Sequence, residues 1–394
     1  MAAYLPLIVL LVILAATLRD DFALTLIYLF IGAFAAGTWW SRKSLGQVEA
    51  ERQFIDHAFL GEKVEVSLHF RNRGWLPVLW LSLQDALPVG LSTFPAFAQV
   101  TSLGPKAGMH FKYTLEARKR GYYPVGPLFL STGDLLGLSG TLQTEGPAQH
   151  LTVYPKIIPL TFIDIPSRSP QGTLRHHRPI FEDPTRVFSK REYVAGDSLR
   201  RVDWKTTAAT GRLQVKLFEP SIALETLIFL DLNAANYPSR RQIDATELAI
   251  VIAASVAAWI AGKKQTVGLK VNGKDPLMDG GLPRYFPPRK GQAHLMRLLE
   301  TLARVQMIEG TSFETLIQRQ RCQLSWGTTL LVITGKASAA LLDELYQARQ
   351  AGQDAVLILA GPADYVPEMT RRAAHFGIPL VNLSNERALD LWRK

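Results

Sequence analysis

One short stretch of the sequence gathers charged and aromatic side chains closely enough to form a network of ion pairs. Residues 188–211 mix cations and carboxylates, with a Gly-Asp pair at their centre and a tryptophan after it. A Gly-Asp pair favours a tight turn, and an aspartate can accept two parallel hydrogen bonds from one guanidinium. The candidate residues are Arg191, Glu192, Tyr193, Gly196, Asp197, Arg200, Arg201, Asp203, Trp204 and Lys205.

The chemistry open to these residues is binding rather than catalysis. We expect the three arginines to donate to Asp197 or Asp203, with Trp204 packed beneath the network. Such a network either braces this segment against the following domain or presents a docking surface for a partner protein. The motif contains no His or Cys that could act as nucleophile or proton switch, so an enzymatic role is not expected.

This stretch closely resembles the signature of a bacterial membrane-protein family catalogued as a domain of unknown function, number fifty-eight. The family pattern reads R-E-Y-x-x-G-D-x-x-R-x-I-D-W-K-x-[ST]-A-R, followed by a short apolar strand and a glutamate. Leu213–Phe218 and Glu219 stand at those last positions, whereas Ala209 stands where arginine is common. Upstream matches extend the resemblance over nearly the whole chain: Arg120-Gly121-Tyr122, Gly126-Pro127, Asp134, Gly137-Leu138 and Val153-Tyr154-Pro155.

The resemblance implies a von Willebrand A-like domain after the motif. Domains of that class bind Mg²⁺ through oxygen ligands on three loops, the chemistry that this ion requires. Asp231, Asn233 and Thr311 are the candidate ligands here, but Ala235 offers no ligand in the first loop. Lys336 follows the third strand where an aspartate is expected. We therefore expect no tight metal site and no cofactor, with Asp231 capping a strand end or a helix instead.

The resemblance also implies a partner, because such proteins are typically encoded beside a MoxR-type AAA+ ATPase and often near other membrane proteins. The expected function is a non-enzymatic scaffold that docks cytoplasmic partners during the assembly or maturation of other proteins. Two alternatives stay open: binding of anionic lipid or nucleic acid through residues 168–216, and a weak metal-dependent adhesion-type site at Asp231. Lys and Arg in 168–216 number eleven against five Asp and Glu. They alternate with acids, so nucleic acid is not expected.

Residues 222–394 are expected to form the α/β domain that positions Asp231. Apolar strand candidates alternate with helical stretches, which is typical of a mostly parallel, doubly wound sheet. The helix Leu248–Ala261 is apolar almost all round and too short to span a membrane, so we expect it to be buried. Asp244 and Glu247 resemble a capping box before it. The other elements expected are strands at 224–230, 266–271, 328–334 and 355–360 and helices at 291–306 and 338–351.

Residues 45–158 are expected to form a β-sandwich, joined to the α/β domain by a basic linker at 159–221. Apolar residues alternate with polar ones at 64–70, and the turn signal Arg71-Asn72-Arg73-Gly74 follows. Further short runs at 79–83, 111–115 and 128–130 are separated by Pro and Gly. Short strands at this spacing predict a sandwich. His176 and His177 in the linker form no pattern typical of a metal site.

Residues 1–44 are expected to form a hairpin of two transmembrane helices. Met1–Leu18 and Phe22–Ser41 carry no charged side chain, and each is long enough to span a bilayer. Arg42 and Lys43 after the second segment place the rest of the chain in the cytoplasm, at the bacterial inner membrane. A single cysteine, Cys322, suits that compartment. A signal peptide, a buried hairpin or spanning by the second segment alone are the alternatives.

Overall fold

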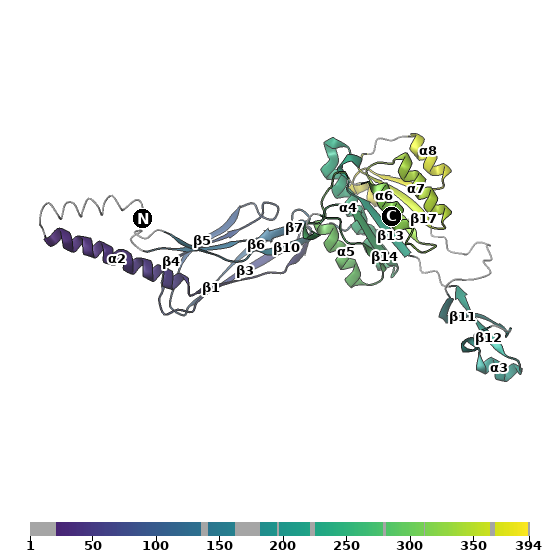
Figure 1. Cartoon of the computed structure of the whole chain (residues 1–394), viewed down its shortest axis with the longest axis horizontal. Helices are drawn as coiled ribbons and strands as arrows, with labels where there is room; N and C mark the ends of the chain where they lie inside the picture. The colour runs from purple at the N-terminus through teal and green to yellow at the C-terminus, as the bar shows by residue number, and fades with distance from the viewer. Residues whose placement is uncertain are drawn as a thin grey trace. The chain divides into compact units, whose positions relative to one another are not determined.

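The computed structural model describes residues 21–134, 141–161, 182–194, 197–220, 225–278, 281–310, 312–362 and 367–392 (Figure 1). The chain divides into two compact units, Met1–Lys156 with Leu299–Arg304, and Ile157–Leu298 with Val305–Lys394. Several sequence predictions lie outside the described residues: the first membrane segment 1–18, Gly137-Leu138, the His176-His177 pair, Gly196 and Thr311.

The second predicted membrane segment forms helix α2, Asp21–Leu45. Its large apolar side chains are exposed, among them Phe22, Tyr28 and Leu29. By length and composition, two described helices could cross a bilayer: Leu24–Leu45, of which 11% is buried, and Ser239–Gly262, of which 72% is buried. Most of the described side chains of the first are therefore not buried, which is compatible with membrane association.

Among the described residues of the first unit, ten strands follow α2, grouped into sheets of order β1-β3-β6, β5-β4-β8-β9 and β2-β10-β7. Buried and exposed residues alternate along β3, so one face of the strand lies in the core. Leu68 of β3 and Leu83 of β4 belong to a single hydrophobic cluster. The strands are β1 Val48–Gln53, β2 His57–Phe59, β3 Lys63–Asn72, β4 Val78–Ala86, β5 Ala96–Leu103, β6 Gly108–Glu116, β7 Gly121–Val125, β8 Leu128–Thr132, β9 Leu142–Glu145 and β10 Gln149–Tyr154.

A buried ion pair crosses this core. The Arg52 guanidinium donates to Asp85 through Nε at 3.0 Å and Nη2 at 2.5 Å, and both side chains are almost fully enclosed. The remaining donors of Arg52 reach the carbonyl oxygens of Val125 and Pro147, while the Tyr113 hydroxyl donates to Asp85 at 2.7 Å. The pair is thus hydrogen-bonded on all sides, as a buried charge must be.

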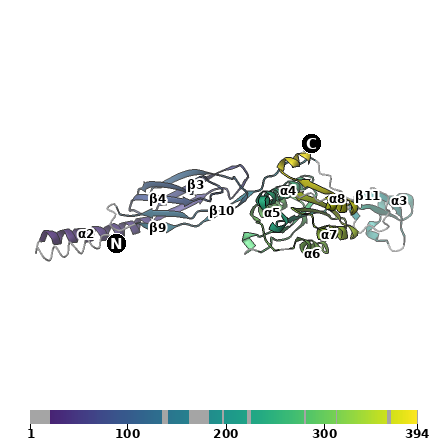
Figure 2. The same ribbon diagram turned by 90° about the horizontal axis from the view of Figure 1, so that it is seen from above.

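The second unit contains a six-stranded sheet of order β15-β14-β13-β16-β17-β18, in which only β15 runs antiparallel to its neighbour. The chain passes from β13 to β14 on one side and returns to β16 on the other, so the order reverses between β13 and β16. Helices flank the sheet (Figure 1 and Figure 2). The strands are β13 Glu225–Asp231, β14 Thr266–Asn272, β15 Phe286–Arg289, β16 Thr329–Thr334, β17 Asp354–Ala360 and β18 Leu380–Leu383.

Alternate residues of the central strands face different helices. Leu227, Phe229 and Val332 share a core with α6 and α7, and α4 packs against the same strands. The predicted alternation of strands and helices is therefore present, and the sheet is largely parallel. The helices are α4 Gln242–Gly262, α5 Gln292–Arg304, α6 Phe313–Arg321, α7 Ala339–Gln350 and α8 Pro367–His375.

Helix α4 is buried as expected, but its predicted capping box is wrong. The helix begins at Gln242, and its N-cap position, Arg241, makes no side-chain cap bond. Asp244 lies inside the first turn. The physical reason is that a 3-10 turn at Ser239–Arg241 leads directly into α4, and the Gln242 amide donates to the Ala234 carbonyl. This contact fixes the start of the helix in place of a cap.

Candidate functional site

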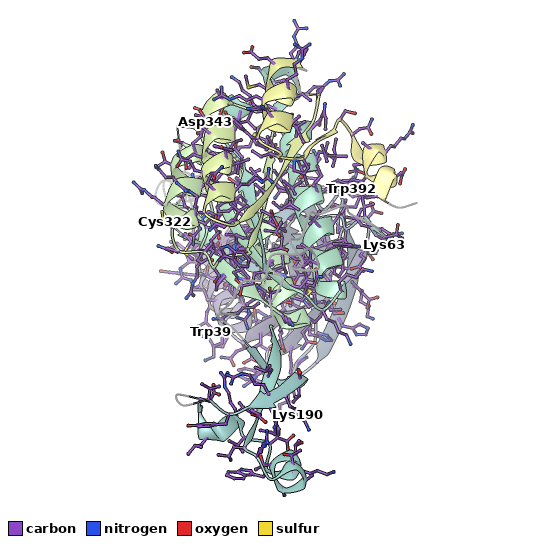
Figure 3. All side chains as sticks on the ribbon, turned by 90° about the vertical axis from the view of Figure 1, so that its right-hand side faces the viewer. Trp39, Lys63, Lys190, Cys322, Asp343 and Trp392 are labelled. Atoms are coloured by element: carbon purple, nitrogen blue, oxygen red, sulfur yellow. The ribbon has the colours of Figure 1, made fainter. Side chains whose placement is uncertain are left out.

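The signature residues form a small module of two antiparallel strands and a short helix. Strand β11, Glu182–Glu192, pairs with β12, Gln214–Pro220, with Arg191 opposite Val215. Helix α3, Trp204–Thr210, lies between them in sequence and ends at Gly211 in the left-handed conformation, φ 69°. The segment predicted as a linker thus contains regular structure. Figure 3 shows Lys190 on this module.

The first ion pair of the module closes the turn after β11. The Arg191 guanidinium donates to both oxygens of Asp197 at 2.7 Å, which confirms the predicted bidentate geometry. Val194 and Asp197 also exchange bonds, since the Val194 N–H donates to the carboxylate and the Asp197 N–H to the Val194 carbonyl, each at 3.0 Å. The Arg191 guanidinium and then the Val194 N–H lower the pKa of Asp197. The turn is therefore held by charge-assisted bonds.

The second ion pair ties β11 to helix α3. Asp203 is the N-cap of α3 and accepts from the backbone N–H groups of Lys205 and Thr206 at 3.2 and 3.3 Å. Lys190 lies 2.7 Å from the other carboxylate oxygen. Hydrogen bonding from Lys190, followed by that from the Thr206 N–H, lowers the pKa of Asp203 to about 2. Asp203 thus takes a lysine as an ion-pair partner, which the sequence analysis did not predict.

Strand geometry explains why the two carboxylates take different partners. Consecutive side chains of a strand point to opposite faces, so Lys190 and Arg191 cannot serve the same carboxylate easily. The remaining predicted residues lie around these two ion pairs. Glu192 pairs with Arg212 at 3.0 Å on the exposed surface, and the Tyr193 N–H donates to the Leu213 carbonyl. Also at the surface are Arg201 and Lys205, whereas the Arg200 side chain is not described.

The prediction that Trp204 packs beneath the network is wrong, because 66% of its side chain is exposed. Among the module's described side chains, the buried apolar ones are Val202 and Val215, which form a bridge across it. None of the described side chains of α3 is buried. Val194, Leu199 and Leu213 are exposed as well, at 61%, 62% and 41%, so the module exposes several apolar side chains besides Trp204.

Asp231 forms a second candidate site, at the carboxyl end of β13 where the strand order reverses. Its carboxylate is fully buried and accepts from four protein groups. The Asn233 N–H and the Asn272 amide donate to Oδ1 at 2.9 and 3.1 Å. The Asn236 amide and the Thr334 hydroxyl donate to Oδ2 at 2.7 and 2.8 Å. Thus Asp231 ties the ends of β14 and β16 to the loop that follows β13.

Burial raises the pKa of Asp231 to about 6, although the bonds from Asn233, Thr334 and Asn236 act in the opposite direction. The Tyr237 hydroxyl donates to the Asp231 carbonyl at 2.5 Å, which adds a further constraint on the same loop. Sequence reasoning missed Asn236, Asn272 and Thr334 as partners. Their position at or just beyond the ends of parallel strands was the available signal, because these ends converge on one edge of the sheet.

The described residues do not fit a Mg²⁺ ion. An ionised carboxylate offers about four lone-pair positions, and protein donors occupy that number on Asp231. The Asn233 side-chain oxygen accepts from the Ala235 N–H at 3.2 Å, so it caps a turn. Among the described residues, no cluster of three His, Cys, Asp or Glu could hold a metal. The arrangement instead immobilises the loops at the strand ends.

Residues 189–347 match a family model described as Protein of unknown function DUF58. The match runs from the signature module to helix α7. An "Uncharacterized protein YeaD" of Bacillus subtilis (strain 168) is 25% identical over 248 residues, which are 62% of this chain and 58% of that protein. An uncharacterised protein of Mycobacterium tuberculosis (strain H37Rv) is 27% identical over 29% of this chain and 34% of its own length. The chain thus spans between about a third and three fifths of these relatives.

Two solved structures each align with about a quarter of the chain. The CARDB domain of the PF1109 protein from Pyrococcus furiosus, in complex with di-metal ions, aligns with 27% of this chain and 91% of its own, at 14% identity and a TM-score of 0.20. A cohesin module from a Clostridium perfringens family 33 glycoside hydrolase aligns with 27% of this chain and 96% of its own, at 10% identity and a TM-score of 0.20. Similarity at this level carries no functional meaning.

Proposed function

We propose that the protein is a non-enzymatic, membrane-anchored scaffold that docks a cytoplasmic partner through the signature module. The observation that carries this proposal is the exposure of Trp204 together with Val194, Leu199 and Leu213 on one small module. Exposed apolar patches on folded domains commonly mark interaction sites. Tryptophan is also enriched among the residues that dominate binding energy at protein interfaces.

The ion pairs of the module support this role, because they hold the apolar residues before any partner arrives. Asp197 fixes the turn that carries Val194, and Asp203 fixes the first turn of α3, where Trp204 lies. A surface that is ordered in advance loses less conformational entropy on binding. The two interpretations of the motif, as a brace or as a docking surface, are therefore compatible, because the internal ion pairs stiffen the module while its outer side chains remain available to a partner.

The proposed partner is a MoxR-type AAA+ ATPase, which is what the resemblance to the domain-of-unknown-function family implies. The surplus of cations in residues 168–216 favours an acidic surface on that partner. The membrane anchor is α2, and Arg42 with Lys43 favours a cytoplasmic position for the rest of the chain. By holding the ATPase at the membrane, the scaffold would support the assembly or maturation of other membrane proteins. The saturated hydrogen bonding of Asp231 favours a structural role for that residue.

The test compares two tryptophans with similar exposure. A photo-crosslinking amino acid at position 204, in native membranes, should capture the ATPase, whereas one at Trp326, which is 52% exposed in the α/β unit, should not. With purified proteins, Trp204→Ala should raise the Kd for the ATPase about 30-fold. This is the effect of losing a side chain that contributes about 2 kcal/mol to the binding free energy. Trp326→Ala is the matched control. Equal capture at both positions, or no ATPase at either, would contradict the proposal.

A further inference from the structure

The end of the β-sandwich next to helix α2 contains two turns that are tied together. The buried Asn72 side chain donates to the carbonyls of Leu76 and Gly104 at 2.8 and 3.1 Å. Its oxygen accepts from the Gly74 N–H at 2.8 Å. The Lys106 N–H donates to the Gly74 carbonyl at 3.1 Å. The β3–β4 turn and the β5–β6 turn therefore form one rigid end of the sandwich.

Helix α2 is fixed to this same end. The Trp40 indole N–H donates to the Pro77 carbonyl at 3.0 Å, and the Arg73 N–H donates to the Gln47 carbonyl at 2.9 Å. Only residues 46 and 47 separate α2 from β1. Higher up the helix, Gly37 lies against Asp134, since a Cβ at Gly37 would lie 2.9 Å from the Asp134 Cβ. Protein thus covers one side of α2 from about Gly37 onward.

This arrangement leaves a short stretch of α2 for the hydrocarbon layer. The uncharged residues before Gly37 are 22–36, and at a rise of about 1.5 Å per residue they measure roughly 22 Å. A bilayer core is about 30 Å thick, so the sandwich end must approach the bilayer closely if α2 is to cross it. The side chains at that end would then meet the headgroups.

The exposed side chains at this end match the chemistry of that layer. Trp39 and Trp75 are 55% and 67% exposed, and tryptophan is enriched at membrane interfaces. The exposed cations beside them are Arg42, Lys43, Arg73 and Lys106. Two carboxylates are near: Glu49, which pairs with Arg73 at 2.7 Å, and Asp134. Four cations against two carboxylates leave a surplus of positive charge, which attracts anionic lipid.

We infer that this end of the sandwich is a collar for anionic phospholipid headgroups, with Trp75 seated in the interfacial layer of the membrane that α2 enters. The collar consists of Trp39, Arg42, Lys43, Arg73, Trp75 and Lys106. The inference rests on the proposed membrane anchoring by α2, but it concerns a surface of the β domain and needs no partner protein. It assigns a lipid-binding role to Arg73 and Trp75, which lie in the turn after β3.

The test uses the full chain with the exposed Cys322 changed to serine. A single cysteine replaces either Trp75 or Phe94, and a fluorophore is attached to it. Phe94 is the matched control, because it is 71% exposed in the same domain but follows the far end of β4. Nine strand residues place that end about 30 Å away. Both proteins are reconstituted into vesicles of phosphatidylcholine, with or without phosphatidylglycerol, that carry a nitroxide quencher near the headgroup.

We expect several-fold stronger quenching at position 75 than at 94, and stronger quenching at 75 when phosphatidylglycerol is present. Changing Arg42, Lys43 and Lys106 to glutamine should remove the effect of phosphatidylglycerol. Weak quenching at both positions in a chain that floats with the vesicles would overturn the collar while leaving the anchor intact. Equal quenching at both positions, or quenching at 75 that ignores anionic lipid, would also overturn it. A chain that does not float with vesicles would instead refute the membrane anchor.

Discussion

Replacing Asp231 by asparagine should change how the stability of the α/β unit depends on pH. Asp231 is buried, and burial raises its pKa from 3.8 to about 6. A carboxyl group whose pKa is higher in the folded state binds its proton more tightly there. Its contribution to stability is therefore fully present below the unfolded pKa and is lost as the pH rises through the folded pKa. The relevant window runs from about pH 4 to about pH 6.

The magnitude follows from the same two values. A shift of about two units corresponds to about 3 kcal/mol at 1.36 kcal/mol per unit. Asparagine cannot ionise, so the Asp231→Asn variant lacks this pH-dependent contribution to stability. The variant loses stability at every pH, because its amide must turn a donor toward groups that now donate to the carboxylate. Its deficit relative to the unmodified protein should nevertheless be about 3 kcal/mol smaller at pH 7 than at pH 4.

Hydrogen exchange measured by mass spectrometry on peptides of β13 and β16 gives the local free energy of opening after correction for the intrinsic effect of pH. Comparing the two proteins cancels groups that titrate in both, such as Glu314, whose pKa is lowered by its hydrogen bonds, including those from Ser338 and Ser312, in spite of burial. A deficit that stays constant with pH, or grows toward pH 7, would refute the reasoning. Either result would mean that the four hydrogen-bond donors to Asp231 lower its pKa in the folded state more than burial raises it.

Three further perturbations have defined outcomes. Asp85→Ala should destabilise the β-sandwich by about 3–5 kcal/mol in chemical denaturation, because Arg52 would be left as an unpaired buried charge; a loss below about 1 kcal/mol would contradict the account of this pair. Tyr237→Phe removes the bond to the Asp231 carbonyl and should cost about 1–2 kcal/mol, read from the same exchange peptides. Asp203→Ala should speed amide exchange in α3, whereas Asp203→Ser, which keeps an N-cap oxygen, should restore much of the protection. Equal exchange in the two variants would argue against the capping role.

The sequence predicted elements best where burial is uniform. Helix α4 was expected to be buried because Leu248–Ala261 is apolar on every side, and a helix of that kind must be covered. Strands that end at Asp231 and Thr334 were expected for the same reason. The start of α4 was predicted less well, because the contact between Gln242 and the Ala234 carbonyl joins residues whose proximity depends on the preceding turn.

Side-chain partners were harder to predict than elements. The pair of Arg191 with Asp197 lies within one turn and was among the combinations expected from the sequence, which left the partners open. Asp203 meets Lys190 only because β11 and α3 come together in the folded module, and no local pattern encodes that choice. The error at Trp204 has a similar cause. A tryptophan is usually expected to be covered, but its burial depends on which elements meet around it, and 66% of the Trp204 side chain is exposed.

The absence of a flexible joint between α2 and β1 has a mechanical consequence. Since two residues separate them and the Trp40 and Arg73 bonds bridge them, α2 and the sandwich must rotate as one body. Membrane helices are tilted by about 20° on average from the bilayer normal, over a range of about 0–40°. With strands about 30 Å long, a change of roughly 10° in tilt would displace the far end of the sandwich by about 5 Å. If α2 enters the bilayer as proposed, any change in its tilt would thus change the angle at which the β domain stands away from the membrane.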